Sequence, residues 1–148
     1  MPKTSGKELI ILLVEDNEGD IVLTVEALRE AKIMNKVVVM RDGEEALEYL
    51  YKEGPFADAE LPDIIFLDIN LPRIDGKEVL TRIKNDDNLK FIPVVILTTS
   101  DSEKDIMDSY MSHANCYITK PVDFNKFMQV VNTIKNFWIT LVKLPGQG

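Results

Sequence analysis

DIIFLDINLPRIDG, residues 63–76, is the segment from which the architecture of this chain can be worked out. Its apolar run, Ile64 to Leu67, predicts a buried strand, and the Pro and Gly beyond the run predict that the strand does not continue. The strand therefore places Asp68 at its carboxyl end. In an open α/β sheet, ligands bind outside the carboxyl ends of the strands.

The chain contains further apolar runs of the same kind. Strands are predicted at about Leu9 to Val14, Lys36 to Met40, Asp63 to Leu67, Val94 to Leu97 and Cys116 to Ile118. Helical patterns alternate with them, so the sequence predicts a repeated βα unit and an α/β fold. The polar residues that follow the strands are Glu15 and Asp16, Asp68, Thr98 and Thr99, and Lys120.

The predicted helices follow the strands. The first has Asn17 as a possible cap with Asp20 three residues on, and the others cover about 44–52, 76–84, 103–111 and 124–142. The connection 53–62 before the third strand is longer than the usual αβ connection of about 2–6 residues. We interpret it as a tolerated surface insertion.

The polar residues at the strand ends indicate a phosphoryl-transfer site. Glu15, Asp16 and Asp68 would repel one another at one sheet edge unless a cation neutralised them. Mg²⁺ fits, because it prefers hard oxygen ligands and is usually held by carboxylates together with a phosphate oxygen. A carboxylate can attack phosphorus to form an acyl phosphate, and the Lys120 ammonium and a threonine hydroxyl can contact its oxygens.

Four motifs resemble those of the receiver domain of two-component response regulators. They are VEDN at 14–17, FLDINLP at 66–72, PVVILTTS at 93–100 and YITKP at 117–121, in the order of the family and at compatible spacing. The resemblance covers roughly Leu9 to Trp138. It implies a flavodoxin-like, doubly wound (βα)5 fold with a five-stranded parallel sheet in the order 2-1-3-4-5.

The resemblance also assigns roles in phosphorylation. Asp68 would accept a phosphoryl group from a sensor histidine kinase, Thr98 would bind this group, and Lys120 would pair with it. Tyr117 matches the aromatic residue that the family rotates inward on activation, and a packed strand aromatic is the alternative. The peptide bond between Lys120 and Pro121 would be cis.

The same resemblance implies a set of Mg²⁺ ligands. Asp16 and Asp68 would bind the ion directly, and Glu15 would assist through a water molecule. Asn70 would contribute its backbone carbonyl.

The function that follows is a switch, in which phosphorylation changes the affinity for another protein. Relay of the phosphoryl group onward, or its removal from the kinase as a phosphate sink, stays open. The rival is a magnesium-dependent phosphatase of the haloacid dehalogenase type, which needs a second Asp where this chain has Asn70. We therefore expect no enzymatic activity beyond self-phosphorylation and autodephosphorylation.

Size and composition set further limits. The 148 residues predict a single receiver domain with a core at about 9–142 and short flexible tails at 1–7 and 145–148. A chain of this length is expected to be too short for a receiver together with a DNA-binding output domain. A net charge of −8 without a basic cluster argues against nucleic acid as a partner. No apolar stretch reaches the roughly 18 residues that span a bilayer, so we expect a cytoplasmic protein. Cys116 is expected to be an inert core thiol.

The fifth predicted helix has more apolar surface than one face of a sheet requires. Phe127 belongs to its core face, whereas Val130, Phe137 and Leu144 extend one flank. Either the C-terminal part folds back onto its own domain, or the flank forms a homodimer. The tail from Phe137 to Pro145 resembles that of receivers that serve bacterial phytochromes, which favours a dimer and suggests a light- or redox-sensing, phytochrome-like kinase as the donor.

Overall fold

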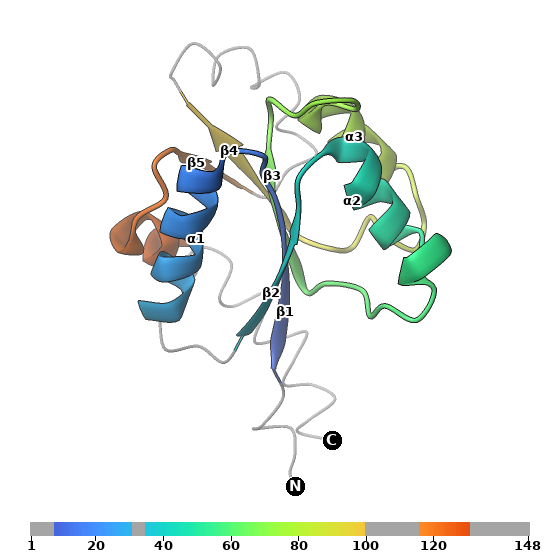
Figure 1. The fold of residues 1–148 in the computed structure, drawn as a ribbon, viewed down its shortest axis with the longest axis horizontal. Helices are drawn as coiled ribbons and strands as arrows, with labels where there is room; N and C mark the ends of the chain where they lie inside the picture. Colours follow the sequence, from blue (N-terminus) through green and yellow to red (C-terminus); the bar gives the residue numbers. More distant parts are fainter. Residues whose placement is uncertain (1–7, 31–34, 100–115, 131–148) are drawn as a thin grey trace, which may run out of the picture.

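A parallel β-sheet runs through the middle of the protein (Figure 1). The computed structural model describes residues 8–30, 35–99 and 116–130. Neighbouring strands are parallel and lie in the order β2-β1-β3-β4-β5, which confirms the predicted doubly wound topology. The strands are β1 (Leu9–Val14), β2 (Asn35–Met40), β3 (Ile64–Asp68), β4 (Val94–Thr98) and β5 (Cys116–Thr119).

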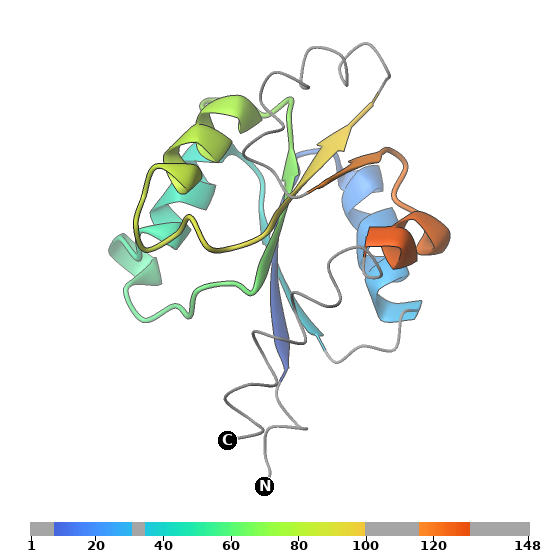
Figure 2. The same ribbon diagram turned by 180° about the vertical axis from the view of Figure 1, so that it is seen from behind.

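Helices cover both faces of the sheet, as Figures 1 and 2 show from opposite sides. On one face lie α1 (Glu18–Glu30) and the helical residues 124–130. On the other face lie α2 (Gly43–Leu50) and α3 (Gly76–Lys84). Because neither face is exposed to solvent, the central strands are apolar at nearly every position instead of alternating with polar residues.

Successive strand residues point to opposite faces and so build two separate cores. Leu12 of β1 and Ile65 of β3 belong to the core beneath α2 and α3. Their chain neighbours Leu13 and Phe66 belong to the core beneath α1, where the Phe66 ring lies 5.8 Å from that of Phe127. The strand side chains fill the two cores, so the side chains available for a functional site are those that follow the ends of the strands.

The helix starts follow local capping signals. Asn17 accepts a hydrogen bond from the backbone N–H of Asp20 at 2.9 Å, as predicted. Asp75 caps α3 in the same way, and α3 has the predicted bounds. By contrast, α2 ends at Leu50, before the predicted end at Lys52, whose φ of 57° is left-handed and cannot continue a helix.

The connection 53–62 is packed onto the domain. It contains a short 3-10 helix, η2 (Gly54–Phe56), and the Phe56 ring meets the ring of Tyr49 edge to face at 5.5 Å. The Tyr49 hydroxyl donates to the carbonyl of Glu60 at 3.0 Å. The insertion thus covers the end of α2.

One prediction for the fifth helix is wrong. Val130, expected on an exposed flank, is 5% exposed and packs in the same core as Phe127. The two residues are three positions apart, so they lie on one face of the helix, and the core is wide enough to take both. Phe137 and Leu144, the predicted fourth helix at 103–111 and the predicted tails lie outside the described residues.

Two further predictions can be compared with the structure. Cys116 is half-buried, and burial raises the pKa of its thiol to about 11, which keeps it protonated and unreactive as expected. Among the described residues, none of the helices is long and apolar enough to cross a membrane.

Candidate functional site

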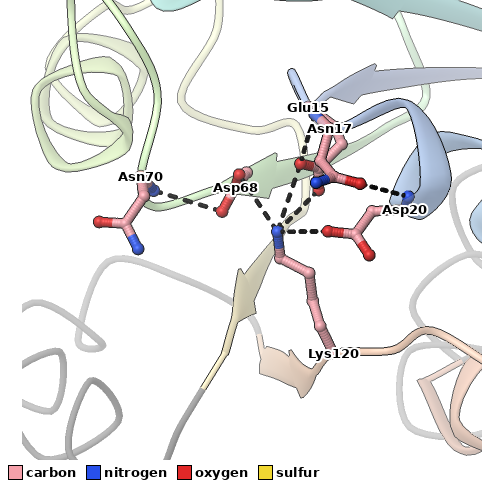
Figure 3. A network of polar contacts seen from close by, with 6 residues as sticks. All are labelled: Glu15, Asn17, Asp20, Asp68, Asn70 and Lys120. Atoms are coloured by element: carbon pink, nitrogen blue, oxygen red, sulfur yellow. Dashed lines mark hydrogen bonds and ion pairs between the residues drawn. The ribbon is translucent and has the colours of Figure 1, made fainter.

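The carboxyl ends of the central strands bring the predicted site residues together (Figure 3). Val14 of β1 is paired with Leu67 of β3, so the residues that follow, Glu15 and Asp68, emerge at the same level. Both are buried, with 0% and 2% of their surface exposed. Two carboxylates withdrawn from water beside each other need a positive charge nearby.

The acidic group fits a divalent cation. Glu15, Asp16 and Asp68 each offer a carboxylate oxygen, and these oxygens lie within 4.8 Å of one another. Asp16 is exposed, so the group opens towards solvent on one side. Asn70 lies directly beside it, and its backbone N–H donates to Asp68 Oδ1 at 3.2 Å. An all-oxygen donor set of this charge is what Mg²⁺ prefers.

Lys120 supplies the positive charge. Its ammonium nitrogen lies 3.0 Å from Glu15 Oε1, 3.1 Å from Asp20 Oδ2 and 3.3 Å from Asp68 Oδ2 (Figure 3). Its side chain is only 9% exposed. The sequence pattern predicts Asp20 only as part of a helix cap and not as a site residue. The available signal was an acid in the first turn of the helix that follows Glu15 and Asp16.

These contacts shift the pKa values of the site. Burial, and then the charge of Asp68, raises the pKa of Glu15 to about 7, against the opposing effect of Lys120. Burial also raises the pKa of Asp68, and Lys120 opposes this shift. Burial alone would lower the pKa of Lys120, but the carboxylates of Asp68, Glu15 and Asp20 raise it. Lys120 is therefore a permanent cation at this site.

Two glycines hold the loop after Asp68 in place. A Cβ at Gly76 would lie 2.3 Å from the carbonyl oxygen of Asp68, and one at Gly43 would lie 1.8 Å from that of Ile74. The Gly76 N–H donates to the carbonyl of Ile69 at 3.0 Å. Residues 69–75 are thus pressed against the starts of α2 and α3, where only glycine leaves enough room.

The remaining predicted residues lie on β4 and β5. Thr98 ends β4 and is 1% exposed, and its carbonyl accepts a hydrogen bond from the Lys120 N–H at 2.7 Å. Tyr117 is half-buried on β5 and packs against the core beneath α2 and α3. The bond between Lys120 and Pro121 is cis, as predicted. Backbone pairing thus links the threonine directly to the lysine.

The family model that matches the chain describes the response regulator receiver domain and covers residues 11–132. The response regulator Rcp1 from Synechocystis sp. is 41% identical over 146 residues, which are 99% of this chain and 99% of Rcp1. The chain therefore belongs to the response regulator receiver family and has a receiver's role in two-component signalling.

Solved structures agree with this assignment. The crystal structure of the phosphorylated cyanobacterial phytochrome response regulator RcpA is 50% identical, with a TM-score of 0.75 over 91% of this chain and 96% of that one. The Mn²⁺-bound form of Rcp1 is 42% identical, with a TM-score of 0.73 over 88% and 94% of the two chains. The bacteriophytochrome response regulator RtBRR is 42% identical, with a TM-score of 0.81 over 86% and 78%.

Proposed function

We propose that Asp68 is the residue that a sensor histidine kinase phosphorylates, and that its modification changes the affinity of this domain for another protein. The observation that carries the proposal is the surroundings of this carboxylate. Asp68 is buried at a strand end, lies 3.3 Å from a lysine ammonium, and shares an oxygen cluster with Glu15 and Asp16. Few arrangements other than phosphoryl transfer need a carboxylate, a fixed cation and a divalent metal site together.

The chemistry uses the Asp68 carboxylate as the nucleophile. One of its oxygens attacks phosphorus and forms a P–O bond, while the P–N bond of the donor phosphohistidine breaks and its electron pair stays on the imidazole nitrogen. Lys120 faces the oxygens where negative charge collects. Asp16, Asp68 and the backbone carbonyl of Asn70 would hold Mg²⁺, with Glu15 assisting through a water molecule, and the ion would supply positive charge that neutralises the carboxylates and the phosphoryl oxygens.

The switch itself would use Thr98 and Tyr117. The Thr98 hydroxyl would bind the phosphoryl group, and this contact would exist only in the modified protein, as a shift between two states requires. The support is its burial at the end of β4, next in the chain to Leu97, which pairs with Asp68. Tyr117 of β5 pairs with Ile96, which lies on the same strand as Thr98. Tyr117 would therefore follow a movement of β4.

The donor kinase is proposed to be phytochrome-like. The support is that RcpA and RtBRR are described as phytochrome response regulators. The predicted homodimer, the single-domain organisation and the cytoplasmic location belong to the same proposal and stay predictions. Catalysis would be limited to self-phosphorylation and autodephosphorylation, and the downstream partner would be a protein.

The test is phosphorylation by acetyl phosphate in Mg²⁺, followed by intact-mass measurement of the parent, Asp68→Asn and Asp87→Asn. The parent and Asp87→Asn should each gain one phosphoryl group, because Asp87 is exposed and lies outside the site. Asp68→Asn should gain none, since an amide is a far weaker nucleophile than a carboxylate. A labelled Asp68→Asn protein would contradict the assignment, and steady turnover of small phosphate esters would favour the phosphatase.

A further inference from the structure

We infer that Asp20 is a positioning residue for phosphoryl transfer, because it holds the Lys120 ammonium beside Asp68 when a cation occupies the acidic group. The inference rests on the proposed role of Asp68 as the phosphoacceptor. Asp20 comes from the first turn of α1, whereas the other two carboxylates that contact Lys120 follow β1 and end β3. It therefore approaches the lysine from a separate element (Figure 3).

The Lys120 ammonium has three N–H donors and three carboxylates beside it. It donates hydrogen bonds to Glu15 Oε2 at 3.3 Å and to Asp20 Oδ2 at 3.1 Å, and it forms an ion pair with Asp68 Oδ2 at 3.3 Å. The ammonium can thus keep its hydrogen bond to Asp20 while it faces an acceptor at Asp68. With only 9% of the lysine side chain exposed, water has little room to replace a lost partner.

The three partners differ in what a cation would do to them. Among the described residues, the carboxylates close enough to share a cation are Glu15, Asp16 and Asp68, and Asp20 is not one of them. A bound cation would partly neutralise the negative charge of Glu15 and Asp68, so both carboxylates would then attract the Lys120 ammonium less strongly. Asp20 is the partner of Lys120 whose charge stays available.

Asp20 is itself fixed in position. Its backbone N–H donates to Asn17 Oδ1 at 2.9 Å, and its carboxylate lies at a helix start, where the helix dipole favours a negative charge. On the other side, the backbone of Lys120 is fixed by its 2.7 Å hydrogen bond to Thr98. Both ends of this contact are therefore held, so the ammonium keeps its place while the new P–O bond forms at Asp68 and acetate or imidazole leaves with its electron pair.

The experiment compares the parent, Asp20→Asn, Asp20→Glu and Glu18→Gln. Glu18 is the matched control, because it carries the same charge on the same helical turn but is 68% exposed and pairs with Arg41 instead of Lys120. Three quantities are measured: the rate of phosphorylation by acetyl phosphate in saturating Mg²⁺, the Mg²⁺ affinity by calorimetry, and the ¹H–¹⁵N signal of the Lys120 ammonium in the Mg²⁺-bound protein.

Asp20→Asn should slow phosphorylation about fivefold, which is roughly the effect on a rate of losing one partly exposed charged contact. Its Mg²⁺ affinity should stay within about twofold of the parent, because the residue is not a ligand. The ammonium signal should broaden or disappear as its protons exchange with water. Asp20→Glu should restore most of the rate and the signal, and Glu18→Gln should behave like the parent.

Several outcomes would overturn the inference. The first is an Asp20→Asn protein that keeps the phosphorylation rate and the ammonium signal of the parent. The second is an equal slowing in Glu18→Gln, which would indicate a general charge effect. The third is a loss of Mg²⁺ affinity in Asp20→Asn that matches its loss of rate. If the parent took up no phosphoryl group at all, the proposed function would fail instead. The ammonium signal would still test the contact between Asp20 and Lys120.

Discussion

Glu15 shows how burial turns an ordinary carboxyl group into one that titrates near neutral pH. It has no exposed surface and lies beside a second buried acid, so its charged form is penalised in the folded protein. Lys120, at 3.0 Å, reduces that penalty without removing it. The folded protein thus loses some stability by holding the acidic group that a cation needs.

This penalty predicts how stability depends on pH in the absence of metal. The pKa of Glu15 rises from 4.5 to about 7 on folding, so between these values the folded state binds more protons than the unfolded state. Stability must then fall as pH rises through that window, by at most on the order of 3 kcal/mol for this group. Urea unfolding in a chelator, measured at points from about pH 4.5 to about pH 7, should show this loss.

Glu15→Gln is the matched variant for this measurement, because it keeps the shape of the side chain and cannot ionise. It should lose less stability than the parent over the same pH range. Mg²⁺ should recover stability for the parent above about pH 7, where the carboxylate that attracts the ion is charged. Identical pH profiles for the two proteins would show that Glu15 does not titrate in this window.

At the scale of elements, the loop 69–75 is fixed by close contact with two helix starts. Gly43 and Gly76 are the first residues of α2 and α3, and each would bring a Cβ into a backbone carbonyl. Arg73 adds ion pairs to Asp42 and Glu44 from the loop side. Because Asp68 directly precedes this loop, the helix starts determine where its side chain can lie.

Gly43→Ala and Gly76→Ala should each destabilise the protein by about 1–3 kcal/mol, the usual cost of overpacking. The control is Gly54→Ala, which has no atom within 4 Å of a new Cβ but has a positive φ of 55°. It should lose about 1 kcal/mol from backbone strain alone. Urea unfolding gives the ranking, and a Gly54→Ala loss as large as the other two would disprove the contact argument.

The hydrogen bond from Lys120 to the carbonyl of Thr98 joins the end of β4 to the segment after β5. Thr98→Ala should still take up a phosphoryl group, because the nucleophile and the lysine remain. Its structural response should be weaker, because the hydroxyl contact that separates the two states is gone. Amide exchange across 103–117, with and without beryllofluoride, measures this response.

Thr81→Ala is the control for that experiment, since Thr81 lies on α3 and its exposed hydroxyl donates to the carbonyl of Lys77. It should respond to beryllofluoride as the parent does. If Thr98→Ala responds equally well, the switch does not depend on this hydroxyl.

At the scale of the whole molecule, assembly is the open prediction. Val130 belongs to the core, so the predicted dimer surface reduces to the flank that includes Phe137 and Leu144. A symmetric pair of such flanks would remove both from water. The net charge of −8 opposes association at low ionic strength, so moderate salt is needed to measure it.

Sedimentation of the parent, Phe137→Glu and Asn136→Glu tests the dimer. Each variant adds one negative charge, but Asn136 is a neighbouring polar position. The parent and Asn136→Glu should dimerise at micromolar concentration, more strongly with beryllofluoride, and Phe137→Glu should stay monomeric. A parent that is monomeric under all conditions would favour a C-terminal segment that folds back on its own domain.

The sequence by itself determined where the strands lie, to within about one residue, and most of the site, because these depend on local signals. The strand order followed from the resemblance to the receiver family. Apolar runs predict buried strands, Asn17 and Asp75 satisfy the first N–H groups of their helices, and the residue after a parallel strand must lie at the sheet edge. Local sequence was therefore sufficient to predict Asp68 and Lys120 as site residues.

Only the tertiary structure decided which groups meet across the chain. The contact of Asp20 with Lys120 joins residues 100 positions apart, and no local pattern encodes the direction of either side chain. The burial of Val130 depends on how wide the core beneath α1 is, and the need for glycine at position 76 depends on the path of the Asp68 backbone. Such features follow from packing between elements, whose distances a single sequence does not specify.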